Sequence, residues 1–496
     1  MSFYTELEAR FHQLAAIGQA ISMLHWDAAV LMPSGGAESR AEQIAALVSL
    51  RHELMCRPDM SALFNGAAGE ANEFNPWEAA NLREMQRGWT HATALPADLV
   101  ETRSKASSAC EMQWRAARPK SDYAAVKAPL AEVLRLTREA ATIKAEALGC
   151  SAYDALLDQF SPGIDTTTVE QVFAQLADFL PNFIQSVIER QALRPKPKLP
   201  EGPFPEATQR AVGIVFMKTL GFDFKSGRLD VSSHPFSGGT PDDLRITTRY
   251  DQTEFFTGLM GILHETGHAL YERGLPKDWR LQPVGTPRGM DIHESQSLLI
   301  EMQACRSAPF IGYAAPILKD AFVGRGPEWE SDNLYAAITR VSRGLIRVDA
   351  DEATYPLHVI LRTDLERAML AGDLSIDDLP GAWNEGMERL LGLAPRDEAE
   401  GCMQDIHWFE GAFGYFPSYT IGALTAAQFY AAAVKVQPEI PDAIGRGDFA
   451  PLYAWLGKNI HGLGSLLETP DLIQKATGTH LNPEIFIAHL QARYLN

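Results

Sequence analysis

The sequence predicts a mainly α-helical protein with one small antiparallel β-sheet. Long segments place apolar residues at the three- and four-residue spacing of amphipathic helices, and alternation typical of strands is confined to two short segments, 228–233 and 244–250. These two segments lie directly before a helix predicted over 255–274. With 496 residues, 46% of them hydrophobic, the chain can bury a large core around this arrangement.

Helix start and stop signals follow one another along the N-terminal part. Asn75-Pro76 combines a cap with proline at the first helical position, Asp122 and Gly149 bracket a long helix, and Thr167-x-x-Glu170 has the spacing of a capping box. The expected helices cover 1–24, 37–56, a segment beginning at 76, 97–118, 122–148 and about 167–193.

A proline-rich segment, 195–205, interrupts this helical pattern. Its five prolines predict an extended connector. Another helix ends at Gly221, and the predicted sheet and the helix over 255–274 follow. Beyond them, a loop rich in glycine and aromatic residues is expected over 401–422, and helices are expected over 293–306, 331–348, 350–371, 376–391, 424–435 and 448–456.

Composition limits the possible functions and locations. The net charge of −19 disfavours nucleic-acid binding, which draws on basic surfaces. Charged residues near the N-terminus do not fit a secretory peptide, and no segment offers about 18 uninterrupted apolar residues for a membrane span. Five scattered cysteines suggest reduced thiols rather than a disulfide framework. We therefore expect a cytoplasmic protein that binds neither nucleic acid nor membranes.

The helix over 255–274 contains the motif His264-Glu265-Thr266-Gly267-His268. Histidines four residues apart lie on the same helix face, so both imidazoles can bind one zinc ion, at about 2.0–2.1 Å. Glu265 points elsewhere on the helix, where its carboxylate can take a proton from a metal-activated water and pass it to a leaving amine. The motif indicates peptide-bond hydrolysis. The alternative is a pair of packed core histidines beside a surface glutamate.

A catalytic zinc needs a third protein ligand and an open position. Glu294, in the segment His293-Glu294-Ser295-Gln296-Ser297, is the leading candidate. Asp291, His293 and Glu301 lie nearby in sequence, and spacing alone does not exclude them. Acidic residues in a first helical turn are also ordinary caps.

Several separated motifs resemble the carboxypeptidase Taq family of metallocarboxypeptidases. The resemblance rests on the HETGH and HESQS segments together with His-Pro-Phe at 234–236, Asp243-x-Arg245-x-Thr247, Ile346-Arg347-x-x-Ala350-Asp351 and Gly401-x-x-Gln404-Asp405-x-His407-Trp408. WDAAVLMPSGGAESRAEQ at 26–43 and FGYFPSYTIG at 413–422 extend it over nearly the whole chain.

The resemblance implies roles for residues that spacing alone does not assign. It selects Glu294 as the third metal ligand beside His264 and His268, and Glu265 as the general base. It also points to His407 and Tyr419 as donors to the oxyanion of the tetrahedral intermediate. Zinc is the implied metal, with cobalt as a possible substitute. A large helical, two-lobed fold around a deep groove and a homodimer are implied as well.

An exopeptidase must recognise a free C-terminal carboxylate, and the resemblance points to Arg347 for this task. The planar guanidinium of arginine donates two parallel hydrogen bonds to a carboxylate. The alternative is an intrahelical pair with Asp351, four residues on. Within the motif, Asp351 could instead orient the guanidinium.

We therefore expect a metal-dependent carboxypeptidase that releases single amino acids, with broad specificity, from the free C-terminus of short peptides. The alternatives are a zinc oligopeptidase or dipeptidyl carboxypeptidase, and a non-catalytic helical peptide-binding protein. We expect a single catalytic unit, 1–496, built from an N-terminal helical lobe, about 1–194, a linker, 195–205, and a metal- and substrate-binding lobe, about 206–496.

Overall fold

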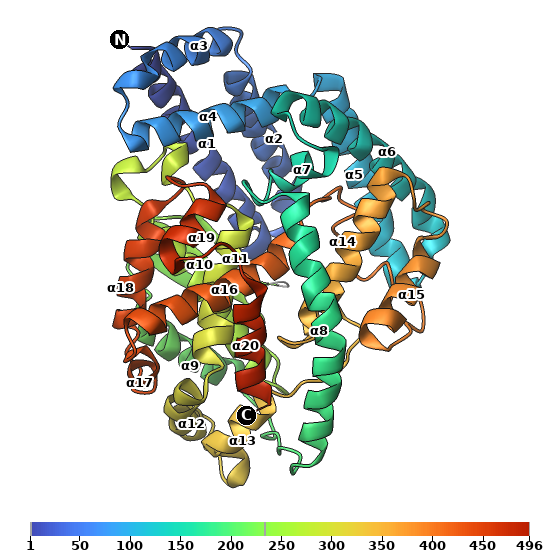
Figure 1. The fold of residues 1–496 in the computed structure, drawn as a ribbon, viewed down its shortest axis with the longest axis vertical. Coiled ribbons are helices and arrows are strands. Elements are labelled where there is room, and N and C mark those ends of the chain that lie inside the picture. Colours follow the sequence, from blue (N-terminus) through green and yellow to red (C-terminus); the bar gives the residue numbers. More distant parts are fainter. Residues whose placement is uncertain (1, 233–234, 496) are drawn as a thin grey trace.

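The computed structural model describes residues 2–232 and 235–495, and most of them are helical (Figure 1). The N-terminal helices are α1 (Phe3–Val30), α2 (Ala37–Met55), α3 (Met60–Glu70), α4 (Pro76–Thr93), α5 (Ala97–Ala117), α6 (Tyr123–Leu148), α7 (Ala152–Leu157), α8 (Thr166–Ala192) and α9 (Glu206–Thr219). The predicted connector, 195–205, contains no regular element, as expected.

The sheet and the helix with the HETGH motif come next along the chain. The elements from there to residue 338 are β1 (Gly227–Val231), β2 (Ser237–Thr240), β3 (Asp243–Thr248), α10 (Phe256–Gly274), α11 (Met290–Leu298), a π-helix (Leu299–Cys305), α12 (Ala308–Ala321) and α13 (Ser331–Ile338). The last helices are α14 (Tyr355–Ala371), α15 (Leu379–Leu391), α16 (Pro417–Val436), α17 (Ile440–Ile444), α18 (Ala450–Asn459), α19 (Thr469–Thr477) and α20 (Pro483–Tyr494).

The sheet is mixed, so the predicted antiparallel arrangement is wrong. The strand order is β1-β3-β2, with β1 parallel and β2 antiparallel to β3. The additional strand β2 forms an antiparallel hairpin with β3 and pairs with one edge of β3. Strand β1 pairs with the other edge of β3, in the parallel direction. His234, from the His-Pro-Phe motif, lies outside the described residues.

Several helix ends differ from the predicted ones because tertiary contacts override local signals. The predicted helix over 331–348 ends at Ile338. Beyond it, the Val341 amide donates to Gln191 Oε1 at 3.0 Å and the Val341 carbonyl accepts from Gln191 Nε2 at 3.2 Å, so these backbone groups are not used for a helix. The cap of α8 is Asp165, whose carboxylate accepts the amide of Thr168 at 2.8 Å, not Thr167. Helix α16 begins seven residues before the predicted start, 424.

Three main hydrophobic cores hold the helices together. The first joins α6 and α8 to α14, α15 and α20; the second surrounds α10 and α11 with α9, α12 and α18; the third packs α1 against α3 and α4. Helix α16 belongs to the first two, through Ile421 and Leu424 on one side and Phe429 and Ala433 on the other. Because the first core draws on segments from both sides of the connector, the lobe boundaries stay a prediction.

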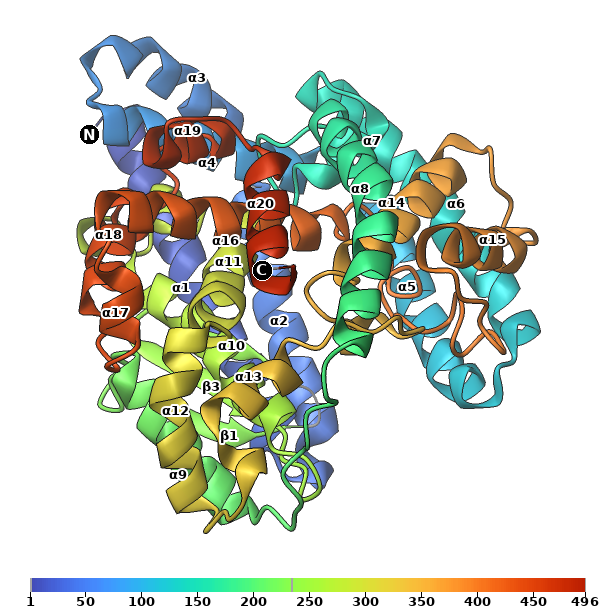
Figure 2. The same cartoon turned by 60° about the horizontal axis from the view of Figure 1, so that its bottom comes forward.

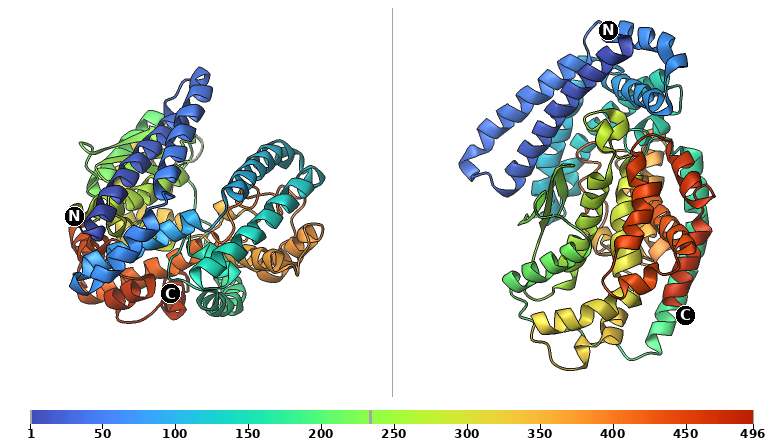
Figure 3. Two further views of the ribbon diagram at one scale, coloured as in Figure 1. Left: turned by 90° about the horizontal axis from the view of Figure 1, so that it is seen from above. Right: turned by 90° about the vertical axis from the view of Figure 1, so that its left-hand side faces the viewer.

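The helices form two arms when the molecule is viewed from above (Figure 3, left). One arm holds the α1–α2 hairpin and the sheet, and the other holds α5, α6, α8 and α15; Figure 2 shows the same separation from another side. Helix α10 packs on the sheet, α11 packs between α10 and α16, and these three helices position the candidate site. Among the described residues, no helix has both the length and the hydropathy that a membrane span requires.

The C-terminal helix α20 is anchored by a buried carboxylate, Glu352. Its oxygens accept from Arg493 at 2.9 Å and from the Tyr494 hydroxyl at 3.0 Å, and one contacts His489 Nε2 at 2.9 Å. Burial alone raises the pKa of Glu352, but the charge of Arg493 and the hydrogen bonds outweigh it and hold the pKa well below the usual range. The ionised carboxylate therefore stabilises the folded protein.

Glu352→Gln is expected to lower the free energy of unfolding by about 3–5 kcal/mol at pH 7, because it leaves the Arg493 guanidinium buried without its counter-charge. Since the pKa of Glu352 is depressed in the folded state, its contribution is present above the ordinary carboxyl pKa and is lost as pH falls. Denaturant unfolding followed from pH 7 down to about pH 2, well below the ordinary carboxyl pKa, measures both effects. A wild-type advantage that stays constant over this range would contradict the assignment.

Candidate active site

The two motif histidines project from α10 toward the same carboxylate. His264 Nε2 lies 3.8 Å from Glu294 Oε1, and His268 Nε2 lies 3.5 Å from Glu294 Oε2. One ligand atom from each of the three residues lies within 4.8 Å of the others, and no other such group of histidine, cysteine or acidic residues occurs in the described part of the chain. The structure thus brings together the three residues that were expected to bind the metal.

Close helix packing brings Glu294 to the histidines. A Cβ atom on Gly267 would lie 2.7 Å from the Gln296 carbonyl oxygen, so glycine in the HETGH motif permits the approach of α11 to α10. On the opposite side of α11, a Cβ atom on Gly422 of α16 would lie 2.9 Å from Glu294 Cβ. Helix α11 is therefore held between α10 and α16, which positions the Glu294 side chain.

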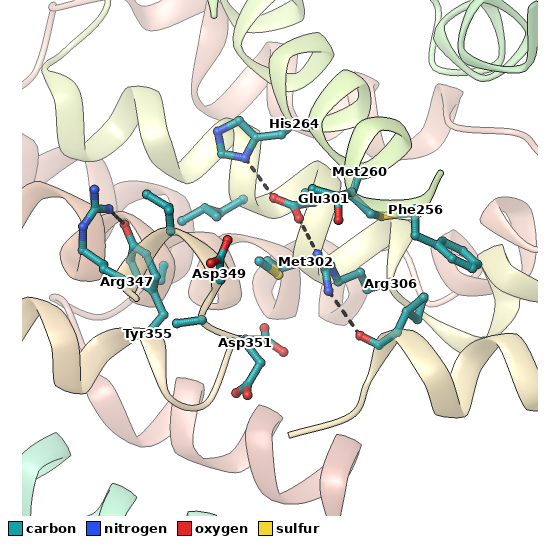
Figure 4. A pocket seen from close by; sticks show the side chains of 18 of the residues that line it. Phe256, Met260, His264, Glu301, Met302, Arg306, Arg347, Asp349, Asp351 and Tyr355 are labelled. Atoms are coloured by element: carbon teal, nitrogen blue, oxygen red, sulfur yellow. Dashed lines mark hydrogen bonds and ion pairs between the residues drawn. The ribbon is translucent and has the colours of Figure 1, made fainter. Parts of the chain in front are cut away.

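The other ring nitrogens contact a second layer of residues. His264 Nδ1 lies 3.0 Å from Glu301 Oε2, whose other oxygen accepts from Arg306 Nη2 at 2.8 Å (Figure 4). His268 Nδ1 lies 2.6 Å from His293 Nδ1, and His293 Nε2 lies 3.0 Å from Glu272 Oε1. Such contacts orient imidazole ligands so that Nε2 faces the metal. Glu301 and His293, considered above as alternative ligands, therefore contact the two candidate ligand histidines through their Nδ1 atoms.

Asp291, the remaining alternative as third ligand, is not part of this group. Its side chain is fully buried. Burial raises the pKa of Asp291 to about 7. Its backbone carbonyl would lie 3.1 Å from a Cβ on Gly422, so this residue lies at the contact between α11 and α16.

The electrostatics of the site favour a cation among its carboxylates. Burial raises the pKa of Glu265 to about 7. For Glu294, burial acts in the same direction, but the charge of His264 outweighs it and lowers the pKa to about 2. Burial lowers the pKa of His264, yet Glu294 and Glu301 outweigh it and raise the pKa to about 10. Positive charge is stabilised here, and two imidazoles with one carboxylate suit a divalent cation.

A cleft of about 760 Å³ opens over these residues and extends from α10 to the segment that precedes α14. Figure 4 shows His264 and Glu301 at one side of it and Arg347 and Tyr355 at the other. Site residues that line the cleft are His264, Glu265, Glu294, Arg347 and Tyr419. The general-base candidate and the carboxylate-binding candidate therefore face one space.

Arg347 is buried. It lies in a short 3-10 turn, Arg347–Asp349, and not in the predicted α-helix over 331–348. Its Nε and Nη2 donate to Asp405 Oδ1 at 3.0 and 2.8 Å. The predicted alternatives that paired Arg347 with Asp351 are wrong, because Asp351 accepts the amides of Ser342, Ala353 and Thr354. Asp405 lies within the GxxQDxHW motif, but no role was predicted for it. The sequence therefore did not predict Asp405 as the partner of Arg347.

Tyr419 and His407 lie together near Arg347. The Tyr419 ring centre is 4.9 Å from the Arg347 guanidinium carbon, and its hydroxyl is 3.3 Å from His407 Nε2. Tyr419 belongs to α16 rather than to a loop. Its side chain lines the cleft, whereas His407 is not among the residues that line it. His407 therefore contacts the cleft residues through the Tyr419 hydroxyl.

Gly422→Ala is expected to weaken metal binding by about 10- to 100-fold, because the new methyl group would displace the Glu294 side chain. Competition with a metal-binding dye measures the affinity of the folded variant. Gly312→Ala is the matched control, since a Cβ there meets no atom within 4 Å and the residue is also helical. Equal metal affinity of both variants and the wild type would refute the packing argument.

The helical fold, the cleft and the three residues that could hold a metal ion fit a metal-dependent peptidase. The model of the carboxypeptidase Taq (M32) metallopeptidase family matches residues 6–494, so the chain belongs to this family. It is a metal-dependent carboxypeptidase, a hydrolase of peptide bonds.

Individual relatives agree with this assignment. Thermostable carboxypeptidase 1 of Thermus thermophilus is 36% identical, with 99% of this chain and 97% of the relative covered. The structure of Trypanosoma cruzi metallocarboxypeptidase 1 matches with a TM-score of 0.98 and 39% identity, over 100% of this chain and 99% of that one. An M32 carboxypeptidase from Deinococcus radiodurans R1 matches with a TM-score of 0.93 and 34% identity, over 99% and 98%.

Proposed function

We propose that this carboxypeptidase releases single amino acids, with broad specificity, from the free C-terminus of short peptides. One observation carries the proposal: Arg347 and the group His264, His268 and Glu294 line or adjoin the same cleft. A peptide whose terminal carboxylate reaches Arg347 has its last peptide bond on the side of the cleft where Glu265 lies. A cleft of about 760 Å³ has room for a peptide segment, which favours short peptides as substrates.

We assign the metal to His264, His268 and Glu294 and propose zinc, with cobalt as a possible substitute. A bound divalent cation would lower the pKa of a water and polarise the scissile carbonyl. Glu265 is not needed as a ligand, so its carboxylate is available to accept the proton of the attacking water. It then donates that proton to the departing amine.

Tyr419 and His407 complete the proposed site. The Tyr419 hydroxyl donates to the oxygen that becomes negative in the tetrahedral intermediate, and His407 orients this hydroxyl through their 3.3 Å contact. We further propose that the protein is a cytoplasmic homodimer and that residues 1–496 form one catalytic unit, with lobes at about 1–194 and 206–496 joined by 195–205.

Mass spectrometry of the products from a ten-residue peptide tests the proposed function. A carboxypeptidase gives a ladder of products that differ by one C-terminal residue, a dipeptidyl carboxypeptidase gives steps of two, and an oligopeptidase gives internal cuts. The same peptide with an amidated C-terminus is the control and should remain intact. Equal cleavage of the free and the amidated peptide would contradict the role of Arg347.

Metal removal is expected to abolish hydrolysis and leave the fold intact, because the three ligand residues come from helices that pack through large hydrophobic cores. Activity on an N-blocked dipeptide should disappear after chelation and return with zinc or cobalt. Circular dichroism before and after chelation checks the fold. Unchanged turnover by protein shown to be metal-free would exclude the metal-dependent mechanism.

A further inference from the structure

The guanidinium of Arg347 is held so that only one edge can meet a substrate. Nε and Nη2 are both used by Asp405 Oδ1, and the second oxygen of Asp405 accepts from Arg362 Nε at 2.6 Å. Nη1 donates to the Tyr355 hydroxyl at 2.9 Å. Because a guanidinium has five N–H donors and three are used by these partners, one donor remains on Nη1 and one on Nη2 within the described structure.

Tyr355 occupies the position beside that remaining edge. It begins α14, its backbone amide donates to the Asp351 carbonyl at 2.9 Å, and its ring packs edge-on against Tyr419 at 6.1 Å. Both Tyr355 and Arg347 line the cleft, and Figure 4 shows the Tyr355 hydroxyl pointing at the guanidinium. The side chain is therefore held in place by its helix, by the guanidinium and by a neighbouring ring.

The Tyr355 hydroxyl has a proton to donate. Its oxygen accepts from Arg347, and among the described residues no acceptor lies within hydrogen-bond distance of its own O–H. Burial holds the pKa of Tyr355 above the usual range, so the hydroxyl stays protonated at neutral pH. A group that accepts hydrogen bonds and touches the Nη1–Nη2 edge would lie next to this donor.

We propose that Tyr355 is a second donor to the C-terminal carboxylate of the substrate and that Arg347 and Tyr355 together form a carboxylate clamp. The proposal rests on the carboxypeptidase function proposed above and adds a residue to its binding site. A carboxylate offers only acceptors, so it matches the two free N–H groups and the O–H. A terminal amide places N–H donors against the same three donors, so the clamp discriminates against amidated ends and against internal segments.

Peptide binding to the zinc-loaded Glu265→Gln variant tests the clamp without turnover. Isothermal titration compares an N-acetylated pentapeptide that has a free carboxylate with its C-terminal amide. Adding Tyr355→Phe, which removes only the hydroxyl, should weaken binding of the free acid about 10- to 100-fold, the range for one hydrogen bond to a charged group. Binding of the amide should change by less than about twofold. An equal loss for both peptides, or no loss for the acid, would overturn the clamp.

Two further variants in the same background keep the test specific. Tyr313→Phe removes a hydroxyl that contacts Thr219 at 3.3 Å, outside the residues that line the cleft, and should leave both affinities unchanged. Arg347→Ala should reduce the preference for the acid more strongly than Tyr355→Phe, because it removes two donors and the positive charge. If Arg347→Ala reduces the preference for the acid and Tyr355→Phe leaves it unchanged, the clamp is overturned and the proposed carboxypeptidase function stands. If the wild type cleaves acid and amide equally, both the clamp and the proposed function are overturned.

Discussion

Glu265→Gln is expected to reduce kcat by about 10²- to 10⁴-fold, the range by which a positioned general acid-base contributes to turnover. Glu265 is buried, with 8% of its surface exposed, and it lines the cleft beside the three proposed ligand residues without being one of them. Glutamine has nearly the same shape and cannot take a proton from water. The variant should therefore lose hydrolysis and keep its metal.

The measurement combines steady-state kinetics on an N-blocked dipeptide with metal analysis of the same preparation. Asp349→Asn is the matched control, because Asp349 is another acidic residue that lines the cleft and has no proposed role. It should retain near wild-type turnover. A Glu265→Gln protein with full activity would exclude general-base catalysis by this residue. A variant that lost its metal would indicate a structural effect instead of a chemical one.

Arg347→Ala should lower kcat/KM on free-carboxylate peptides by about 10²- to 10⁴-fold. Two charge-assisted hydrogen bonds to the substrate carboxylate are worth roughly 1.5–3 kcal/mol each, and each 1.4 kcal/mol corresponds to a factor of ten. Asp405 keeps its hydrogen bond with Arg362, so the buried carboxylate is not left without a counter-charge. The loss should therefore concern substrate binding more than folding.

Two comparisons separate this effect from a general loss of function. Arg340→Ala removes another arginine that lines the same cleft and should change kcat/KM by less than about threefold. Arg347→Lys should recover little activity, because an ammonium group cannot reproduce the planar arrangement that Asp405 and Tyr355 hold. Full recovery by lysine would show that charge alone is sufficient.

Some of the site could be predicted because its residues lie within one turn of helix. His264 and His268 are four residues apart, and the periodicity around them predicts the helix that sets their relative direction. The third ligand could not be chosen by spacing, since Asp291, His293, Glu294 and Glu301 all follow within one helical stretch. The structure separates them by the atoms they contact. With the packing allowed by Gly267 and Gly422, Glu294 approaches the Nε2 atoms of both histidines. Glu301 and His293 contact the Nδ1 atoms, and Asp291 is not in the group.

The partner of Arg347 shows a different limit. Local spacing favoured Asp351, yet the predicted helix ends at Ile338 and Asp351 accepts backbone amides instead. Asp405 lies 58 residues further along the chain and meets Arg347 only in the folded structure. Tyr355 likewise received no role, because its hydroxyl becomes informative only beside a guanidinium whose other edge is taken.

The sequence by itself determined the mainly α-helical class, the helix that holds the two histidines and the set of residue types needed for metal-dependent hydrolysis. These follow from patterns that repeat within a few residues, where helix geometry sets the distances. The tertiary structure decided the mixed sheet, the approach of Glu294 to both histidines, and the contacts of Arg347 with Asp405 and Tyr355. These depend on pairing and close packing between distant segments, which no local pattern encodes.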